Sequence, residues 1–99
     1  MTYDYSGGWA NVTGHQSAIY ANSSDPTLSL GFWGDRSMSA YVQAGFPRSK
    51  LLIGAAFYGR SFAQVNNANN GMFQPFSGVP RGVSCFHLHS IFLLPLSVH

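Results

Sequence analysis

The sequence predicts an α/β fold in which a strand, a long loop, a helix and a second strand follow one another. Residues 50–58 form a nearly unbroken apolar run of strand length, which is typical of a strand buried on both faces of a parallel sheet. Residues 1–5 are short and β-prone, and the Ser-Gly-Gly that follows breaks this first strand. Strand, loop, helix and strand in this order indicate one right-handed crossover unit of an α/β protein.

The loop and the helix have recognisable boundaries. Residues 6–31 are rich in Gly, Ser, Asn and Asp and predict a long loop with a turn at Asp25-Pro26. In the next stretch Asp35 is expected to cap the start of a helix, and Gly45 to end it. One face of this helix carries, at helical spacing, Met38, Tyr41 and Val42.

Composition excludes several classes of protein. The 99 residues provide one domain at most, and only 8% of them are charged. The formal net charge of +2 comes from five scattered Lys and Arg, so no basic stripe supports nucleic-acid binding. The apolar stretch 91–96 is far shorter than the roughly 20 residues that span a bilayer, and no signal peptide is recognisable.

Metal, cofactor and disulfide chemistry find no support in the sequence. Cys85 is the only cysteine, so no internal disulfide is possible. His87 and His89 lie near it, but their spacing and the lack of a fourth ligand do not fit a zinc site. We therefore expect no metal and no cofactor.

Polar and aromatic residues cluster at the ends of the two predicted strands. Tyr3 and Asp4 end the first strand, and Tyr58 and Arg60 follow the second. Sites in parallel α/β proteins form where the carboxyl ends of strands meet loops, so these groups could bind a polyol or a carbonyl compound. They could equally be half-buried packing residues with a structural ion pair between Asp4 and Arg60. Spacing alone leaves both interpretations open.

Three segments, in order, carry a resemblance to a known family. "MTYDYSGGW", "TGHQSAIY" and "KLLIGAAFYGRSF" together resemble the family 18 glycoside hydrolases, the chitinases and their relatives, over most of residues 1–82. The resemblance implies a fragment of a (β/α)8 TIM barrel that cleaves β-1,4-linked N-acetylglucosamine polymers. It places Met1–Asp4 on the sixth barrel strand and Lys50–Arg60 on the seventh. Ala55-Ala56 departs from the family, because many members carry Pro before the Tyr-Gly-Arg.

The same resemblance divides the chain into three parts. Residues 1–62 would be a partial catalytic barrel, and residues 63–82 the start of the α+β insertion domain that walls the chitin cleft. Residues 83–99 do not continue the family pattern, and we expect them to be translated intron or frameshifted sequence. Met1 would then correspond to an internal strand residue, with coding sequence missing upstream.

The family's mechanism is substrate-assisted: the acetamido oxygen of the sugar attacks the anomeric carbon while a Glu protonates the leaving oxygen. By resemblance, Tyr3 would hydrogen-bond that acetamido oxygen and Asp4 would bind sugar groups near the scissile bond. Trp9 would stack on a sugar ring, and His15 and Gln16 would hold the loop. The residues expected to bind substrate are Met1, Tyr3, Asp4, Trp9, Tyr58 and Arg60.

Activity of the isolated chain is not expected, because its only acidic residues are three Asp and the general acid Glu is absent. Two strands of a barrel would also leave open edges, so no stable independent fold is expected. The expected partner is chitin or a chito-oligosaccharide, and family members are extracellular. Two alternatives remain: a non-catalytic chitinase-like lectin, and a truncated pseudogene product.

Overall fold

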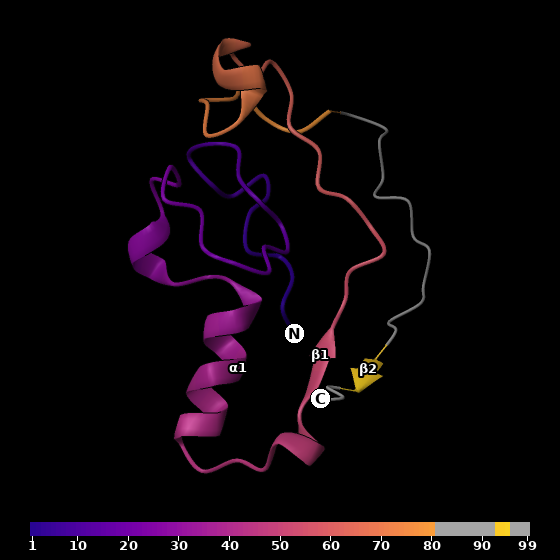
Figure 1. Cartoon of the computed structure of the whole chain (residues 1–99). Helices are drawn as coiled ribbons and strands as arrows, with labels where there is room; N and C mark the ends of the chain where they lie inside the picture. The colour runs from indigo at the N-terminus through magenta and orange to yellow at the C-terminus, as the bar shows by residue number, and fades with distance from the viewer. Residues whose placement is uncertain (81–92, 96–99) are drawn as a thin grey trace.

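The computed structural model describes residues 1–80 and 93–95 of the chain. Its helix is α1 (Gly34–Gln43), and its strands are β1 (Leu52–Gly54) and β2 (Leu93–Pro95) (Figure 1). Three short 3₁₀ turns lie at Leu28–Leu30, Arg48–Lys50 and Ala68–Gly71. In the described part of the chain, no helix combines the length and the apolar composition that crossing a bilayer requires.

Helix α1 begins where expected, but Asp35 does not cap it. The N-cap residue is Trp33, and Asp35 lies inside the first turn. The backbone N–H groups of Gly34 and Asp35 donate at 2.9 Å to the carbonyl oxygens of Ala18 and Ile19 in the preceding loop. The predicted side-chain cap is therefore wrong, because the loop backbone already satisfies the free N–H groups of the helix start.

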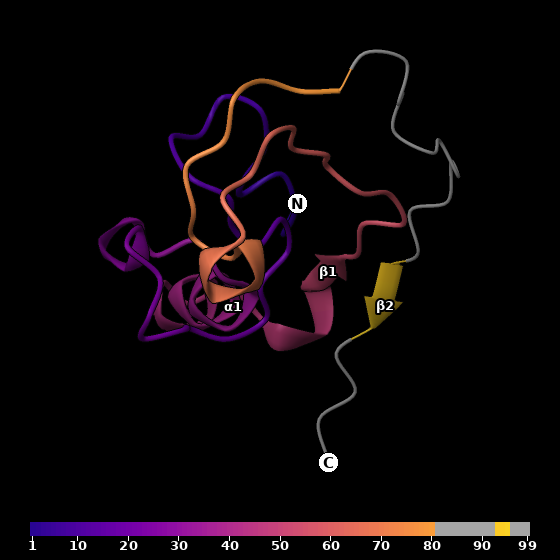
Figure 2. The same ribbon diagram turned by 90° about the horizontal axis from the view of Figure 1, so that it is seen from above.

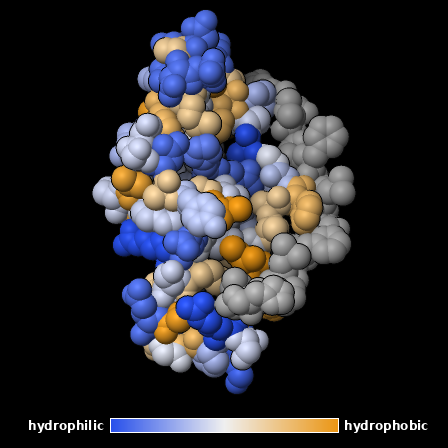
Figure 3. Space-filling view, in the orientation of Figure 1, coloured by the Kyte–Doolittle hydropathy of each residue, from blue (hydrophilic) through white to orange (hydrophobic). Residues whose placement is uncertain are grey.

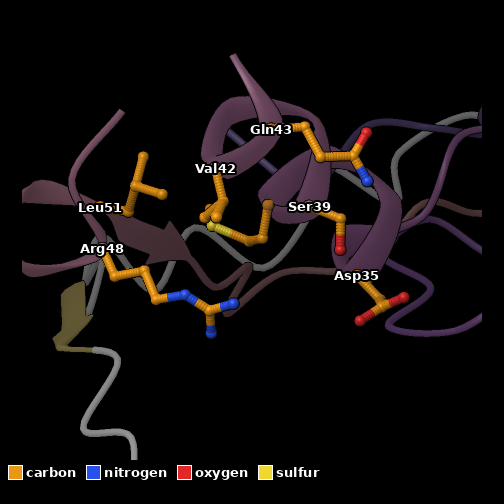
Figure 4. A pocket seen from close by; sticks show the side chains of 7 residues that line it. Asp35, Ser39, Val42, Gln43, Arg48 and Leu51 are labelled. Atoms are coloured by element: carbon orange, nitrogen blue, oxygen red, sulfur yellow. The ribbon is translucent and has the colours of Figure 1, made fainter. Parts of the chain in front are cut away.

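The end of α1 and part of its apolar face are as predicted. Gly45 follows the helix with φ +91°, a left-handed conformation that favours glycine. Met38 and Val42 face Leu51 across a pocket of about 230 Å³, and Figure 4 shows Val42 and Leu51 on its two sides. Tyr41 is 57% exposed, so it does not belong to this face. The pocket therefore lies between α1 and the residues just before β1, and the side chains there do not fill it.

The predicted strands are shorter or missing. Residues 50–58 yield only β1, and residues 1–5 form no strand. Residues 1–4 still run beside β1: the Thr2 hydroxyl donates to the Gly54 carbonyl oxygen at 2.5 Å, and in both ribbon views the N-terminus lies on the side of β1 away from β2 (Figures 1 and 2). One side-chain bond is not a backbone ladder, so the expected parallel pair does not form here.

Strand β1 instead pairs with a segment that no sequence argument placed there. It is antiparallel to β2, with Leu52 opposite Pro95, Ile53 opposite Leu94 and Gly54 opposite Leu93. Pro95 has no N–H to donate, which limits β2 to a short edge strand. The proposed aberrant origin of residues 83–99 stays a prediction, and its other residues lie outside the described part of the chain.

The described residues bury almost no apolar core. Leu51 is the one buried large apolar residue among them, at 8% exposure, and the buried polar residues are Thr2, Ser6 and Thr13. Leu52, expected to be buried on its face of the strand, is 46% exposed. Figure 3 likewise shows apolar side chains spread over the visible surface. The prediction of a strand covered on both faces is wrong for this chain by itself.

Residues 63–78 fold back onto the N-terminal loop, at the end of the molecule away from β1 (Figure 1). The Thr13 N–H donates to the Gln74 carbonyl oxygen at 2.9 Å, and the Thr13 hydroxyl accepts from the Gln74 N–H at 3.0 Å. The same hydroxyl donates to the Gly71 carbonyl oxygen. The assignment of residues 63–82 to the start of an insertion domain stays a prediction.

Candidate functional site

Asp4 and Arg60, which lie 56 residues apart in the sequence, form an ion pair. Nε and Nη2 of Arg60 both donate to Oδ1 of Asp4, at 2.9 and 2.7 Å. About a third of each side chain is exposed, 30% for Arg60 and 36% for Asp4. The ion pair that the structural interpretation of the two strand ends allowed is thus formed, and both side chains are partly exposed to solvent.

Tyr58 completes the polar part of the cluster. Burial raises the pKa of Asp4, but the Tyr58 hydroxyl and the Arg60 guanidinium lower it by more, so the net shift is downward. Burial and the neighbouring Asp4 carboxylate raise the pKa of Tyr58. At neutral pH Asp4 is therefore an anionic acceptor, Arg60 a cationic donor and Tyr58 a neutral hydroxyl.

Aromatic rings surround the ion pair. The Arg60 guanidinium carbon lies 5.1 Å from the centre of the Trp9 ring and 5.4 Å from that of Tyr58. The Tyr3 and Tyr58 rings meet edge to face, with centroids 6.2 Å apart. We call Tyr3, Asp4, Trp9, Tyr58 and Arg60 the aromatic ion-pair cluster.

Short-range backbone contacts hold the N-terminal half of this cluster in place. The Tyr5 N–H donates to the Gln16 carbonyl oxygen at 2.9 Å, and the Ser17 hydroxyl donates to the Thr2 carbonyl oxygen at 2.6 Å. Between these two anchors Asp4 has φ +59°, a left-handed backbone that is uncommon outside glycine. Four other described non-glycine residues share this left-handed conformation, so the backbone at Asp4 does not by itself distinguish a functional from a structural role: they are Gln64, Asn69, Asn70 and Phe73.

The remaining predicted site residues lie elsewhere. Met1 is 92% exposed, so the structure does not bring it into the cluster. His15 packs edge to face on Phe73, with ring centroids 5.8 Å apart, and Gln16 anchors Tyr5, which agrees with the expectation that they hold the loop. The described residues contain no group of three or more His, Cys, Asp or Glu that could hold a metal ion.

Two residues that the sequence reasoning missed support this region. Gly7 lies under Trp9: a Cβ on Gly7 would be 2.6 Å from Cζ3 of the indole, too close for any side chain. Thr13 ties the loop to residues 71–74 through both its backbone and its hydroxyl. The Gly-Gly-Trp sequence was a signal for the first residue, because a glycine pair before an aromatic permits close backbone approach.

A pocket of about 270 Å³ borders the cluster at Trp9. Tyr5 and Phe32, whose rings stack with centroids 5.7 Å apart, form part of its wall. Together, the cluster and this pocket offer hydroxyl donors, a carboxylate acceptor, a guanidinium and exposed aromatic faces. Such a set suits a sugar, whose hydroxyls form hydrogen bonds and whose apolar ring face stacks on aromatics.

Comparison with known proteins identifies the family. The family model "Glycosyl hydrolases family 18" matches residues 1–86. Chitinase 1 of Aphanocladium album is 39% identical over 82 residues, which are 83% of this chain and 18% of that enzyme. The chain therefore spans about a fifth of the length of this relative.

Solved structures agree with the sequence comparison. Chitinase ChiA74 from Bacillus thuringiensis superposes with a TM-score of 0.72 at 39% identity, covering 76% of this chain and 12% of the other. A family GH18 chitinase variant from Cycas revoluta, solved in complex with (GlcNAc)4, gives 0.70 at 29% identity, covering 86% and 23%. These neighbours are TIM-barrel enzymes. On the family-model match and on these likenesses, the chain belongs to family 18 of the glycosyl hydrolases.

Proposed function

We propose that this chain provides one wall of the sugar-binding cleft of a chitinase acting on β-1,4-linked N-acetylglucosamine. The observation that carries the proposal is the double hydrogen bond from Arg60 to Asp4, which joins two of the family's motifs at one exposed place. The Trp9 and Tyr58 rings lie within 5.4 Å of the same guanidinium, which gives the pair the mixed polar and aromatic surroundings that suit a sugar.

Each member of the cluster has a role in this proposal. The Tyr3 hydroxyl donates a hydrogen bond to the acetamido oxygen of the sugar. This bond positions the oxygen for attack on the anomeric carbon. Asp4, kept ionised by Arg60, accepts hydrogen bonds from sugar groups next to the scissile bond. Tyr58 and Arg60 contact sugar hydroxyls, and Trp9 lies beside a sugar ring.

Hydrolysis itself needs a group that this chain does not contain. The substrate-assisted mechanism requires a protonated Glu, and the 99 residues include none. The proposed contribution of the chain is therefore binding and orientation, not proton donation. Assignment of residues 1–4 and 50–60 to the sixth and seventh barrel strands belongs to the same proposal, as does an extracellular site of action.

A chimaera tests this function. Residues 1–82 would replace the matching segment of the Aphanocladium album chitinase, which supplies the rest of the barrel. We expect the chimaera to hydrolyse (GlcNAc)4, and Asp4→Asn to lower kcat/KM about 100-fold by removing an oriented charge.

Asp35→Asn is the matched control, because Asp35 is exposed in the first turn of α1 and lines the pocket beside α1 instead of the one at Trp9. It should leave kcat/KM within about twofold. A folded chimaera with no turnover, or equal effects of the two substitutions, would contradict the proposed role of Asp4.

A further inference from the structure

Gly54, the last residue of β1, lies against the ring of Tyr3. A Cβ built on Gly54 would be 3.0 Å from Cε1 of Tyr3, which is closer than most side chains approach one another. The next nearest atom, the Cα of Met1, would be at 3.6 Å, an ordinary contact. The Thr2 hydroxyl also donates to the Gly54 carbonyl oxygen, which joins the two segments at this point. A side chain at position 54 would therefore crowd the Tyr3 ring before any other described neighbour.

The backbone conformation does not explain why this position is a glycine. Four described glycines have positive φ, and Gly54 is not one of them: they are Gly31, Gly45, Gly71 and Gly78. Gly54 lies in a strand, opposite Leu93, where other residues fit the backbone and most of them stabilise a strand better than glycine does. A glycine in a strand often marks the close approach of another group. Here that group is the Tyr3 ring.

The backbone on either side of Tyr3 is bonded to the loop that follows it. Before Tyr3, the Thr2 carbonyl oxygen accepts from the Ser17 hydroxyl at 2.6 Å. After it, the Tyr5 N–H donates to the Gln16 carbonyl oxygen at 2.9 Å. A Cβ placed beside the ring would therefore be accommodated mainly by the Tyr3 side chain, because turning a side chain within its rotamer well costs little.

The Tyr3 ring also contacts Tyr58, which follows β1. The two rings meet edge to face, with centroids 6.2 Å apart. Cε1, the atom nearest to Gly54, is bonded to the ring carbon that carries the hydroxyl. A displacement of Cε1 by a few tenths of an ångström, the amount that a Cβ on Gly54 would require, therefore moves the hydroxyl as well.

We propose that Gly54 is a positioning residue, whose missing side chain sets where the Tyr3 hydroxyl lies. This inference rests on the proposed function and deepens it, since that hydroxyl is the group assigned to the acetamido oxygen. Gly54 acts through Tyr3 and has no sugar contact of its own. A misplacement of about 1 Å can cost about 100-fold in rate, so a smaller shift of the hydroxyl should still cost several-fold.

The first test measures the position of the ring by NMR in the full 99-residue chain, without sugar. In the wild-type chain the Gly54 α protons should show NOEs to the Tyr3 ε protons. Gly54→Ala should shift the Tyr3 ε-proton resonances and weaken the NOEs between the Tyr3 and Tyr58 rings. Gly34→Ala is the matched control, because Gly34 is another buried glycine without positive φ, and its Cβ would meet Cδ1 of Ile53 at an ordinary 3.4 Å. It should leave the Tyr3 resonances in place.

The second test measures turnover of (GlcNAc)4 by the chimaera. Gly54→Ala should lower kcat about tenfold, because a misplaced hydroxyl supports the attacking oxygen less well. KM should stay within about twofold, since the Tyr3 contact strengthens only as the oxygen attacks. In a Tyr3→Phe background, Gly54→Ala should have little further effect, because no hydroxyl remains to be misplaced. The midpoint of urea unfolding should not fall, since alanine at an ordinary φ does not destabilise the folded backbone.

The outcomes separate this inference from the proposed function. A loss of kcat in Gly54→Ala that disappears in the Tyr3→Phe background, with Gly34→Ala near wild type, supports the inference. Equal losses with and without the Tyr3 hydroxyl overturn it, as do unchanged Tyr3 resonances in the 99-residue Gly54→Ala chain. An active chimaera that Gly54→Ala leaves unaltered contradicts the inference alone. If the chimaera folds but is inactive, the proposed function fails, and the NMR measurement still decides whether Gly54 sets the position of the ring.

Discussion

The aromatic ion-pair cluster has most of its side-chain contacts formed, whereas the layer made by α1 and residues 48–54 has almost no apolar core. In the cluster, contacts between residues 3–9 and 58–60 join charged, hydroxyl and aromatic groups at short distances. In the layer, α1 faces Arg48 and Leu51, just before β1, across an unfilled pocket, and Leu51 is the single large apolar residue that the described chain buries. The polar and aromatic contacts of the cluster need only two short segments. A hydrophobic core forms only when helices and strands cover it on all sides.

Exposed apolar residues indicate what the layer lacks. Leu52 and Phe57, on and after β1, are 46% and 49% exposed. A TIM barrel of about 250 residues would cover both faces of such a strand. The residues that we propose bind sugar can therefore come together in a segment that is far too small to bury the core behind them.

The largest expected effect is the absence of turnover by the isolated chain. Purified 99-residue protein should release no product from (GlcNAc)4 under conditions in which the chimaera is active, because it contains no Glu to act as general acid. Chromatography of the oligosaccharide products measures this directly. Turnover that Asp4→Asn abolishes would show that the chain has a proton donor of another kind.

Truncation of the buried leucine should be the largest stability effect. In the chimaera, Leu51→Ala should lower the free energy of unfolding by about 3 kcal/mol, the usual cost of such a cavity in a closed core. Leu52→Ala should approach that cost in the chimaera, since the barrel would cover a side chain that is 46% exposed here. Urea denaturation followed by circular dichroism gives both values. A cost below about 0.5 kcal/mol for Leu52→Ala would mean that its face stays open in the barrel.

Glycine substitution next to α1 should have a smaller effect. Gly31 has φ +72°, and a Cβ there would collide with the Arg36 guanidinium. Gly31→Ala should therefore cost about 2 kcal/mol in the chimaera, from backbone strain and crowding together. Gly45 has φ +91° with open space around it, so Gly45→Ala should cost about 1 kcal/mol from strain alone. Equal costs would show that Arg36 moves away freely.

The smallest expected effect is the dependence of the stability of the aromatic ion-pair cluster on pH. The folded pKa of Asp4 is below its unfolded value, so the ion pair stabilises the structure fully above about pH 4 and this stabilisation is lost as the pH falls through the folded pKa. Arg60→Ala should flatten this dependence, whereas Arg48→Ala should not, because Arg48 lines the pocket beside α1. The population of folded cluster, followed by the Asp4 carboxyl resonance between pH 2 and 6, measures the difference. The same dependence in Arg60→Ala would contradict the role of the pair.

The sequence was informative wherever a single segment decides the structure. Helical spacing and Gly45 predicted α1, and the residues at the two strand ends suggested an Asp4–Arg60 pair as one of two interpretations. It failed for the strands, because pairing depends on neighbouring segments: residues 1–5 form no strand, and β1 is limited to Leu52–Gly54. An apolar run shows that a strand needs neighbouring segments to cover it, but it does not show whether the chain contains those segments.

Contacts between distant segments escaped the sequence reasoning for a related reason. Nothing in the residue types indicated that Thr13 would bind residues 71–74, or that β2 would occupy an edge of β1. The stack of Arg60 on Trp9 was also unforeseen, because the exposed indole was assigned to sugar alone. Each of these contacts forms only when segments far apart in the sequence come together, and the spacing of residues along the chain does not predict that.

Differential scanning calorimetry of the full 99-residue chain tests most directly whether a formed site coexists with an unclosed core. We predict a gradual change of heat capacity with temperature and no cooperative peak, because the described residues bury a single large apolar side chain. A single sharp transition with an enthalpy of about 70 kcal/mol, the value for a closed domain of this length, would contradict that account.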